Sequence, residues 1–188
     1  FGEDVLFWER ESITGFYISG VLTLTDSAYD SASMANYESA LESIKYQNTN
    51  TDNPNTGNRT VTWLVNDGDA NSAAVTSTIT VAGANDAPTL ADASGTLSFT
   101  EGDPARVIDG SLTLADVDDT HINSATISIT SGFVSGEDVL SFVDAGSITG
   151  SYNAGSGVLA LTGSASKSSY KSALELITYQ NISENPNT

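Results

Sequence analysis

The stretch GEDVL at residues 2–6 recurs without change at residues 136–140. The match continues beyond it: GVLTL at 20–24 returns as GVLAL at 157–161, and YESALESIKYQN from Tyr37 returns as YKSALELITYQN from Tyr170. The first pair gives an offset of 134 residues (136 − 2), which is the length of a whole domain rather than of a solenoid unit. We therefore interpret the chain as a window onto a tandem array of domain-sized repeats.

The repeat predicts how the chain is divided. Residues 1–84 correspond to the C-terminal part of one β-sandwich repeat, residues 85–90 to a linker, and residues 91–188 to the following repeat. The stretch 57–86 has no counterpart after the second copy. We expect the second repeat to lack its last strands, to have an open edge and a partly uncovered core, and to be completed by a neighbouring chain or by further sequence.

Local patterns are mostly those of strands. VTWLV at 61–65, VTSTITV at 75–81 and ATISIT at 125–130 alternate apolar and polar residues, which is typical of half-buried antiparallel strands. Turn-forming stretches, such as NDGD at 66–69 and NAGSG at 153–157, separate such runs. The pattern predicts an all-β fold, a β-sandwich with Greek-key connections.

One segment in each copy departs from the strand period. Tyr170, Ala173, Leu174 and Ile177 recur at helical spacing, and the corresponding residues of the first copy do the same. We predict a short helix in each repeat, packed on an edge of the sandwich. Its apolar residues should be equally buried in the two copies: Tyr37, Leu41, Ile44 and Tyr46 in the first, Tyr170, Leu174, Ile177 and Tyr179 in the second.

The charge balance favours cations as partners. The chain has 24 Asp and Glu against 6 Lys and Arg, a formal net charge of −18, which repels nucleic acid and anionic lipid. It has no cysteine, so a disulfide framework and a thiolate zinc site are excluded. No run approaches the roughly 18 apolar residues of a membrane span, and we expect neither membrane insertion nor a signal peptide in these residues.

Carboxylates gather where predicted strands begin or end. Asp116, Asp118 and Asp119 follow the strand SLTL, Glu101 and Asp103 follow another, and the two GED acids precede a third. Calcium takes six to eight oxygen ligands, which such loops can supply. We therefore predict calcium at the repeat boundary, with solubilising acidic loops as the alternative. The boundary pair Asn85-Asp86 is, by itself, also an ordinary turn.

Taken together, ANDAPTL, FTEGD, LADVDD, GEDVL and YKSALELITYQN resemble the cadherin-like, VCBS-type repeats of large bacterial RTX-type surface adhesins. The resemblance covers almost the whole chain. It implies a cadherin-like or Ig-like sandwich that extends a long stalk and binds calcium between successive domains. The shorter linker departs from the fuller cadherin pattern and leaves the number of ions open.

The resemblance also implies a set of calcium ligands. Asn85 and Asp86 resemble linker ligands, Asp116 and Asp118 resemble the Asp-x-Asp pair of the following domain, and Glu101 resembles a glutamate that faces the next junction. The GED acids resemble the pair at the lower end of each domain. The complete set is Glu3, Asp4, Asn85, Asp86, Glu101, Asp116, Asp118, Glu137 and Asp138.

Two further motifs have competing interpretations. VNDGDAN, with Asp67 and Asp69, resembles a calcium loop but fits a tight Asp-Gly hairpin turn better. Trp8, Phe16 and Tyr17 could form a platform that stacks on carbohydrate, but aromatic residues more often serve core or edge packing.

Catalysis has little support in the sequence. The single histidine, His121, and the absence of cysteine offer no nucleophile and base pair, so we predict that the protein is not an enzyme. A glycosidase that uses two carboxylates is not excluded by sequence, although the acids found here recur with the repeat, which an active site does not require.

The sequence thus predicts a structural extender of a secreted bacterial adhesin, a calcium-rigidified stalk for cell-surface adhesion and biofilm, whose partners are neighbouring repeats. Two alternatives are a carbohydrate-binding adhesion module and an accessory domain of a large secreted enzyme. Each of these three functions places the chain outside the cell.

Overall fold

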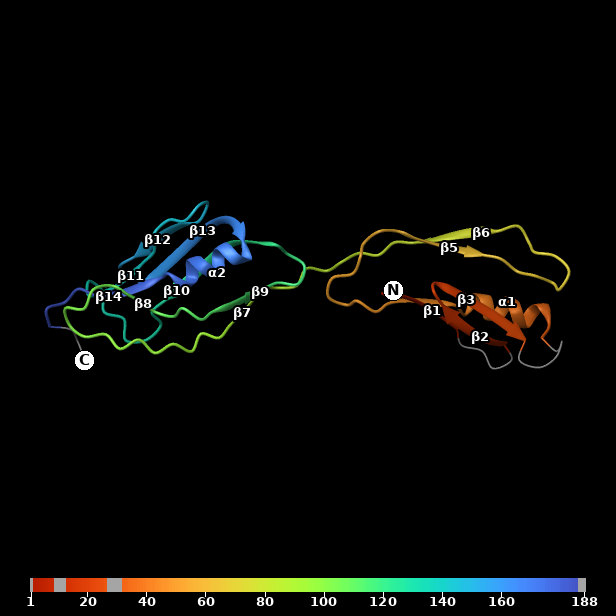
Figure 1. Cartoon of the computed structure of the whole chain (residues 1–188), viewed down its shortest axis with the longest axis horizontal. Helices are drawn as coiled ribbons and strands as arrows, with labels where there is room; N and C mark the ends of the chain where they lie inside the picture. Colours follow the sequence, from red (N-terminus) through yellow and green to blue (C-terminus); the bar gives the residue numbers. More distant parts are fainter. Residues whose placement is uncertain (1, 9–12, 27–31, 186–188) are drawn as a thin grey trace. The chain divides into compact units, whose positions relative to one another are not determined.

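The computed structural model describes residues 2–8, 13–26 and 32–185, and the chain divides into two compact units, Phe1–Ala84 and Asn85–Thr188. Strands dominate both units, as the sequence predicts, and every pair of described strands is antiparallel (Figure 1). The two helices of the described part have nine residues each, so neither is able to cross a bilayer.

The described part of the first unit consists of strand pairs and one helix (Figure 1). Its pairs are β1 (Asp4–Phe7) with β4 (Lys45–Asn48), β2 (Ile13–Ile18) with β3 (Val21–Asp26), and β5 (Arg59–Trp63) with β6 (Val75–Ile79). The helix α1 (Met34–Glu42) begins with a capping box, in which Ser33 and Asn36 each accept a backbone N–H from the other residue. The helix expected around Tyr37 is thereby confirmed.

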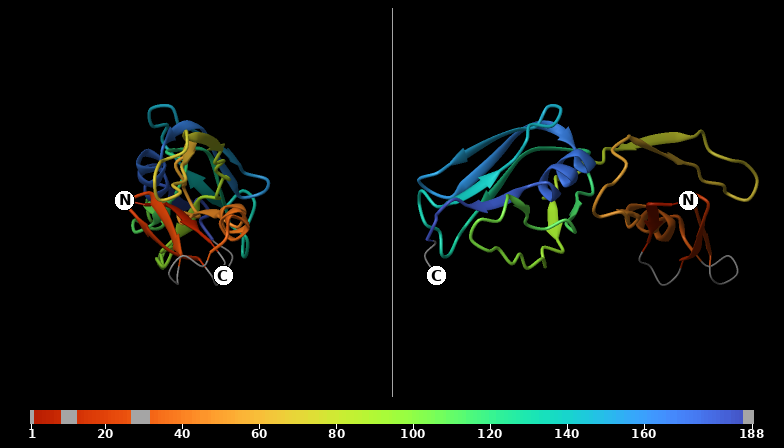
Figure 2. Two further views of the ribbon diagram at one scale, coloured as in Figure 1. Left: turned by 90° about the vertical axis from the view of Figure 1, so that its right-hand side faces the viewer. Right: turned by 60° about the vertical axis from the view of Figure 1, so that its left-hand side comes forward.

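The second unit contains two three-stranded sheets and a further strand pair (Figure 2). One sheet has the order β10 (His121–Ser128), β13 (Val158–Ser166), β12 (Thr149–Asn153), and the other has the order β11 (Asp138–Ser141), β14 (Thr178–Asn181), β8 (Arg106–Val107). β7 (Thr89–Ala91) pairs with β9 (Thr113–Ala115). The predicted second helix, α2 (Lys167–Glu175), follows directly from β13 and contacts β9, β10 and β13.

The sequence repeat is also a structural repeat. β1, β2, β3, α1 and β4 follow one another as β11, β12, β13, α2 and β14 do, and the strands pair in the same way. The hairpin β5–β6 is described only in the first unit, and β7 to β10 only in the second. The two units therefore share five elements, and each has further described strands that the other does not show.

The apolar side chains of the two units are buried to different extents, because the units differ in their neighbouring strands. The second unit has a continuous core, whose buried members are Leu140, Ile148, Leu159, Leu161, Tyr170, Ala173, Leu174 and Ile177. In the first unit Ile13 and Ala40 are buried, whereas Leu41 and Ile44 are only partly buried. The expected equal burial of the two helices therefore holds only in part, because no described strand of the first unit takes the place that β10 has beside β13.

The strand periods expected from the sequence are largely correct. In β5, Val61 and Trp63 are half-buried while Thr60 and Thr62 are exposed. In β10, Ala125 and Ile127 pack against the core. β6 departs from expectation, because Val75 is 63% exposed.

The tripeptide Ile-Thr-Gly occurs at residues 13–15 and again at 148–150, and its glycine has a packing reason. A Cβ atom added at Gly150 would lie 2.8 Å from Cδ1 of Phe142, and one added at Gly15 would lie 3.0 Å from Cη2 of Trp8. Each glycine thus lies under the aromatic side chain that follows the GEDVL strand. A residue with a side chain would displace this ring.

Candidate metal centre

The loop after β9 gathers three carboxylates. Asp116, Asp118 and Asp119 each offer an oxygen, and these oxygens lie within 4.8 Å of one another. Within the described ranges this is the one group of three or more acidic or histidine side chains close enough to hold an ion. Such a group would supply three of the six to eight oxygens that a calcium ion takes.

A local turn holds this loop in place. Oδ1 of Asp116 accepts hydrogen bonds from the N–H groups of Asp118, at 3.2 Å, and Asp119, at 2.8 Å. The hydrogen bond from the N–H of Asp119 stabilises the carboxylate and holds the pKa of Asp116 below its usual value. Lys167, at the start of α2, donates from Nζ to the carbonyl oxygen of Asp116 at 2.5 Å. The loop is thus anchored to the helix.

Asp118 connects this loop to the beginning of the second unit. Its Oδ2 accepts the N–H of Asp86 at 2.9 Å. Its Oδ1 is buried and has no hydrogen-bond partner among the described residues. A buried carboxylate oxygen without a donor is costly, and a cation would remove that cost.

The structure brings some of the predicted calcium ligands together and leaves others apart. The structure brings Asp116 and Asp118 together, adds Asp119, and places the backbone of Asp86 beside them. The side chain of Asn85 donates to the carbonyl oxygen of Asp86 at 2.7 Å. Glu101 is exposed and belongs to no such group within the described residues. Sequence reasoning placed Asp119 in the loop but did not include it among the ligands.

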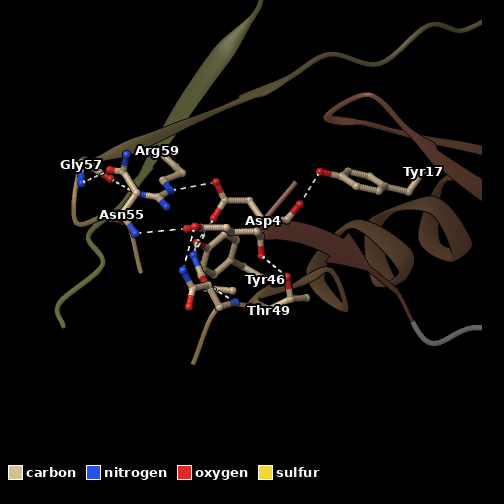
Figure 3. Close-up of polar contacts among 10 residues, drawn as sticks. Asp4, Tyr17, Tyr46, Thr49, Asn55, Gly57 and Arg59 are labelled. Atoms are coloured by element: carbon tan, nitrogen blue, oxygen red, sulfur yellow. Dashed lines mark hydrogen bonds and ion pairs between the residues drawn. The ribbon is translucent and has the colours of Figure 1, made fainter. Parts of the chain in front are cut away.

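Asp4 lies in a network inside the first unit (Figure 3). Its Oδ2 accepts Nε of Arg59 at 2.9 Å, and its Oδ1 accepts the hydroxyl of Tyr46 and, at 3.1 Å, Nδ2 of Asn48. The hydroxyl of Tyr17 donates to its backbone carbonyl at 2.9 Å. The hydrogen bonds from Arg59 and then Tyr46 lower the pKa of Asp4.

Glu3 is held by the loop that follows β4, in which Figure 3 labels Thr49 and Asn55. Its Oε1 accepts Nδ2 of Asn50 at 2.9 Å, and its Oε2 accepts the N–H of Asn55 at 3.1 Å. The hydrogen bond from Asn50, followed by that from Asn55, lowers the pKa of Glu3. Thr49 donates both its N–H and its hydroxyl to the backbone carbonyl of Glu3. Both GED acids of the first unit therefore have partners within that unit.

The second unit repeats this network around Asp138. Oδ1 of Asp138 accepts the hydroxyl of Tyr179 at 2.6 Å and Nδ2 of Asn181 at 3.1 Å, while Tyr152 donates to its carbonyl at 2.6 Å. Oδ2 accepts the N–H of Val134 at 2.7 Å, in place of the arginine of the first unit. Asp138 is only 6% exposed. Its neighbour Glu137 accepts the N–H of Ile182 at its backbone carbonyl.

The sequence missed these partners, although it contained a signal. Tyr46-Gln47-Asn48 and Tyr179-Gln180-Asn181 are identical, and each lies on the strand that pairs with the GED strand. Two identical triplets opposite two identical acids indicate a contact between them. Arg59 gave no such signal, because it occurs in the hairpin β5–β6, which is described only in the first unit.

Two of the three aromatic residues considered as a carbohydrate platform have polar partners of their own. Trp8 donates from Nε1 to the carbonyl oxygen of Ile13 at 3.2 Å, and Tyr17 belongs to the network of Asp4. Phe16 and Tyr17 are adjacent in β2 and so point to opposite faces of the strand, with Phe16 53% exposed. Packing, the interpretation that the sequence favoured, accounts for Trp8 and Tyr17.

The remaining candidates are local structures. Oδ1 of Asp67 accepts the N–H groups of Asp69 and Ala70 at 3.0 and 2.8 Å, which is a side-chain-stabilised turn. His121 is exposed at the start of β10, and its Nδ1 lies 2.9 Å from the hydroxyl of Thr120.

Comparison with known proteins adds one similarity. The chain is 36% identical over 128 residues to Halomucin from Haloquadratum walsbyi, a match that covers 65% of this chain and 1% of that protein. The chain therefore spans about a hundredth of the length of this relative. No family model matches the chain, and no solved structure matches it.

Proposed function

We propose that the chain is part of a structural extender, built from tandem β-sandwich repeats with Greek-key connections, in a secreted adhesin on a bacterial cell surface. Support comes from the repeat itself, in which five elements recur in the same order and pairing. The similarity to Halomucin is consistent with this, because a match to about 1% of a very long protein is what a module of an extended chain would give. Neighbouring repeats of the same chain are its proposed partners.

We further propose that calcium makes this extender rigid, and that Asp116, Asp118 and Asp119 hold it. The observation that carries the proposal is the unpartnered, buried Oδ1 of Asp118 in a loop where three carboxylates converge. The same side chain binds the N–H of Asp86, two residues after the last residue of the first unit. An ion bound here would order the start of the second unit, and the proposed role is mechanical rather than catalytic.

The arrangement of the GED acids narrows the proposed ligand set. Asp138 is buried and Asp4 is paired with Arg59, so each already has donors within its own unit. We assign these acids to internal networks, and the acids of the loop after β9 to calcium. The recurrence of GEDVL then has a simple reason, since each repeat needs the same clamp between its GED strand and its YQN strand.

Calorimetric titration of the full chain with calcium tests the proposal. Extracellular modules bind calcium with dissociation constants of about 0.1 to 1 mM, and we expect the titration to give a dissociation constant in this range. Magnesium should bind more weakly, because it demands a small octahedral shell and gives up its waters reluctantly. Small-angle scattering should show a shorter maximum dimension after chelation. If the scattering profiles with calcium and with chelator superimpose, and the titration gives no heat, the acids belong to solubilising loops and do not bind calcium.

A further inference from the structure

The chain contains two sequons for asparagine-linked glycosylation, the pattern Asn-x-Ser/Thr in which the middle residue is not proline. They are Asn58-Arg59-Thr60, at the start of β5, and Asn181-Ile182-Ser183, at the end of β14. A pattern this short also occurs by chance. The surroundings of each asparagine therefore decide whether its side chain is able to accept a sugar.

The fold occupies the side chain of Asn181. Its Nδ2 donates to Oδ1 of Asp138 at 3.1 Å, and its Oδ1 accepts the N–H of Ser183 at 2.9 Å. Asp138 is 6% exposed and belongs to the clamp between the GED strand and the YQN strand. A sugar on Nδ2 would need the space in which this buried carboxylate lies. The second sequon is therefore closed in the folded chain.

The side chain of Asn58 is open. It is exposed, and its amide makes no hydrogen bond to any residue in the described ranges. Thr60 is also exposed, and its hydroxyl has no partner in the same part of the chain. Arg59 between them is partly buried, so exposed and partly buried residues alternate from 58 to 63. The acceptor amide and the hydroxyl that define the sequon are therefore both accessible to an enzyme.

Arg59, the middle residue of this sequon, anchors the backbone around Asn58 (Figure 3). Its Nε donates to Oδ2 of Asp4 at 2.9 Å, and its Nη1 donates to the carbonyl oxygens of Gly57 and, at 2.6 Å, Asn55. None of these contacts uses the side chain of Asn58. A sugar is therefore attached there without the loss of any hydrogen bond of the network.

We propose that the folded chain is N-glycosylated at Asn58 and that its fold excludes Asn181. In the transfer, Nδ2 of Asn58 attacks C1 of a sugar that carries a phosphate leaving group. The C1–N bond forms, the C1–O bond breaks, the phosphate keeps the electron pair of that bond, and the amide loses one proton to a base of the transferring enzyme. The donor is a phosphate-activated sugar, supplied as a nucleotide sugar or as a lipid-linked oligosaccharide. Glycosylation at Asn58 depends neither on calcium nor on neighbouring repeats, so it goes beyond the proposed extender role.

Peptide mapping of the natural protein, isolated from the cells that make it, tests the modification directly. After digestion with trypsin, the peptides that begin at Tyr46 contain Asn58, and those that begin at Ser172 contain Asn181. We expect the first to carry the mass of one or more sugars and the second to be unmodified. The sugar should survive mild alkali, which removes glycans from serine and threonine hydroxyls but not from an asparagine amide. An unmodified Asn58, or a sugar at Asn181, would overturn the proposal.

The size of the natural glycan identifies the donor. A single hexose, or a series of chain lengths, indicates stepwise transfer from nucleotide sugars. One oligosaccharide of fixed mass indicates transfer as a block from a lipid carrier. Both results support a glycosylation site at Asn58, and they differ only in the source of the sugar.

Glucosylation in vitro shows whether folding makes the choice between the two sequons. The purified full chain is incubated with UDP-glucose and a soluble asparagine glucosyltransferase that accepts both of the synthetic peptides 54–64 and 177–187. The folded chain should accept glucose at Asn58, and at least about tenfold more slowly at Asn181, because the clamp must open first. A folded chain that is not glucosylated at Asn58, or that is glucosylated equally fast at both sites, would contradict the proposal.

Matched variants of the full chain identify the acceptor. Asn58→Gln and Thr60→Ala should abolish glucosylation at the first site, whereas Thr60→Ser should retain it because the hydroxyl remains. Two controls should behave like wild type at this site: Thr62→Ala, which changes another exposed residue of β5, and Ser183→Ala, which destroys only the second sequon. Circular dichroism confirms that each variant is folded. Glucose that is still added to Asn58→Gln or Thr60→Ala at the rate of wild type would show that this sequon is not the site.

Discussion

Tyr179 donates a hydrogen bond of 2.6 Å to Oδ1 of Asp138 across 41 residues of chain, and thereby joins the YQN strand of the second unit to its GED strand. Tyr46 makes the equivalent bond to Asp4 in the first unit. The two bonds differ in their surroundings. Asp138 is 6% exposed, whereas the side chain of Asp4 is 38% exposed.

Replacement of these tyrosines should therefore have unequal effects. Tyr179→Phe leaves a buried carboxylate oxygen with one donor fewer, and we expect the free energy of unfolding to fall by about 1 to 3 kcal/mol. Tyr46→Phe should cost less, because water replaces the lost donor at Asp4. Urea denaturation followed by circular dichroism measures both units, and tryptophan fluorescence follows the first unit alone, where Trp8 and Trp63 lie. Equal losses in the two variants would contradict this reasoning.

The helix of the second unit should show the cost of a core cavity. Leu174 is 8% exposed and packs in the core, so Leu174→Ala should lower the free energy of unfolding by about 2 to 5 kcal/mol. Leu176, two residues later, is 63% exposed and provides the control, with an expected change within about 0.5 kcal/mol. Chemical denaturation compares the two. A similar small loss for both would mean that α2 does not depend on its packing.

Gly163 should tolerate no side chain. Its φ is +121°, and a Cβ atom there would lie 1.9 Å from the carbonyl oxygen of Ser147. Backbone strain and the clash together predict a loss of about 2 to 6 kcal/mol for Gly163→Ala. Gly110 has open space around its Cα and no positive φ, so Gly110→Ala should be nearly neutral. Thermal melts of the two variants test this prediction. A Gly163→Ala variant with the melting temperature of wild type would show that the position tolerates a side chain.

Alkaline pH should destabilise the second unit. Burial raises the pKa of Tyr170, and burial together with the bond to Asp138 raises that of Tyr179. A raised pKa means that the unfolded chain loses these protons first, so stability is complete below the ordinary tyrosine pKa of about 10 and falls as pH rises through the folded value. Unfolding free energies measured at a series of pH values above 9 should show this slope. Tyr170→Phe should make it shallower, and an unchanged slope would exclude Tyr170 as a cause.

Calcium should stabilise the folded chain through the loop after β9. At 100 times the dissociation constant a ligand adds about 2.7 kcal/mol, which calorimetry detects as a higher melting temperature. Asp118→Asn removes a charge but keeps an oxygen that accepts the N–H of Asp86, so the apo protein should remain folded while the calcium effect shrinks. Asp67→Asn, in the exposed turn of the first unit, is the control that should respond to calcium like wild type.

The sequence predicted those parts of the fold that depend on local pattern. Alternation located β5 and β10, and helical spacing located α2, because burial on one face determines each of them. The unequal burial of Leu41 and Leu174 could not be predicted, because it depends on which strands lie beside each helix. The tether between Arg59 and Asp4 was missed for a similar reason, since 55 residues separate the two and no spacing rule connects them.

The near identity of the two clamps also bears on how such a chain reaches its native state. Val5 and Val139 lie on strands of almost the same sequence, and Gln47 and Gln180 are their respective partners. The pairing of β1 with β14 would satisfy the same hydrogen bonds as the pairing with β4. The loop entropy opposes it weakly: the wrong pairing closes 175 residues (179 − 4) instead of 42, which costs about 1 kcal/mol. Exchange of strands between neighbouring repeats is therefore a kinetic hazard, and folding each repeat before the next is synthesised would avoid it.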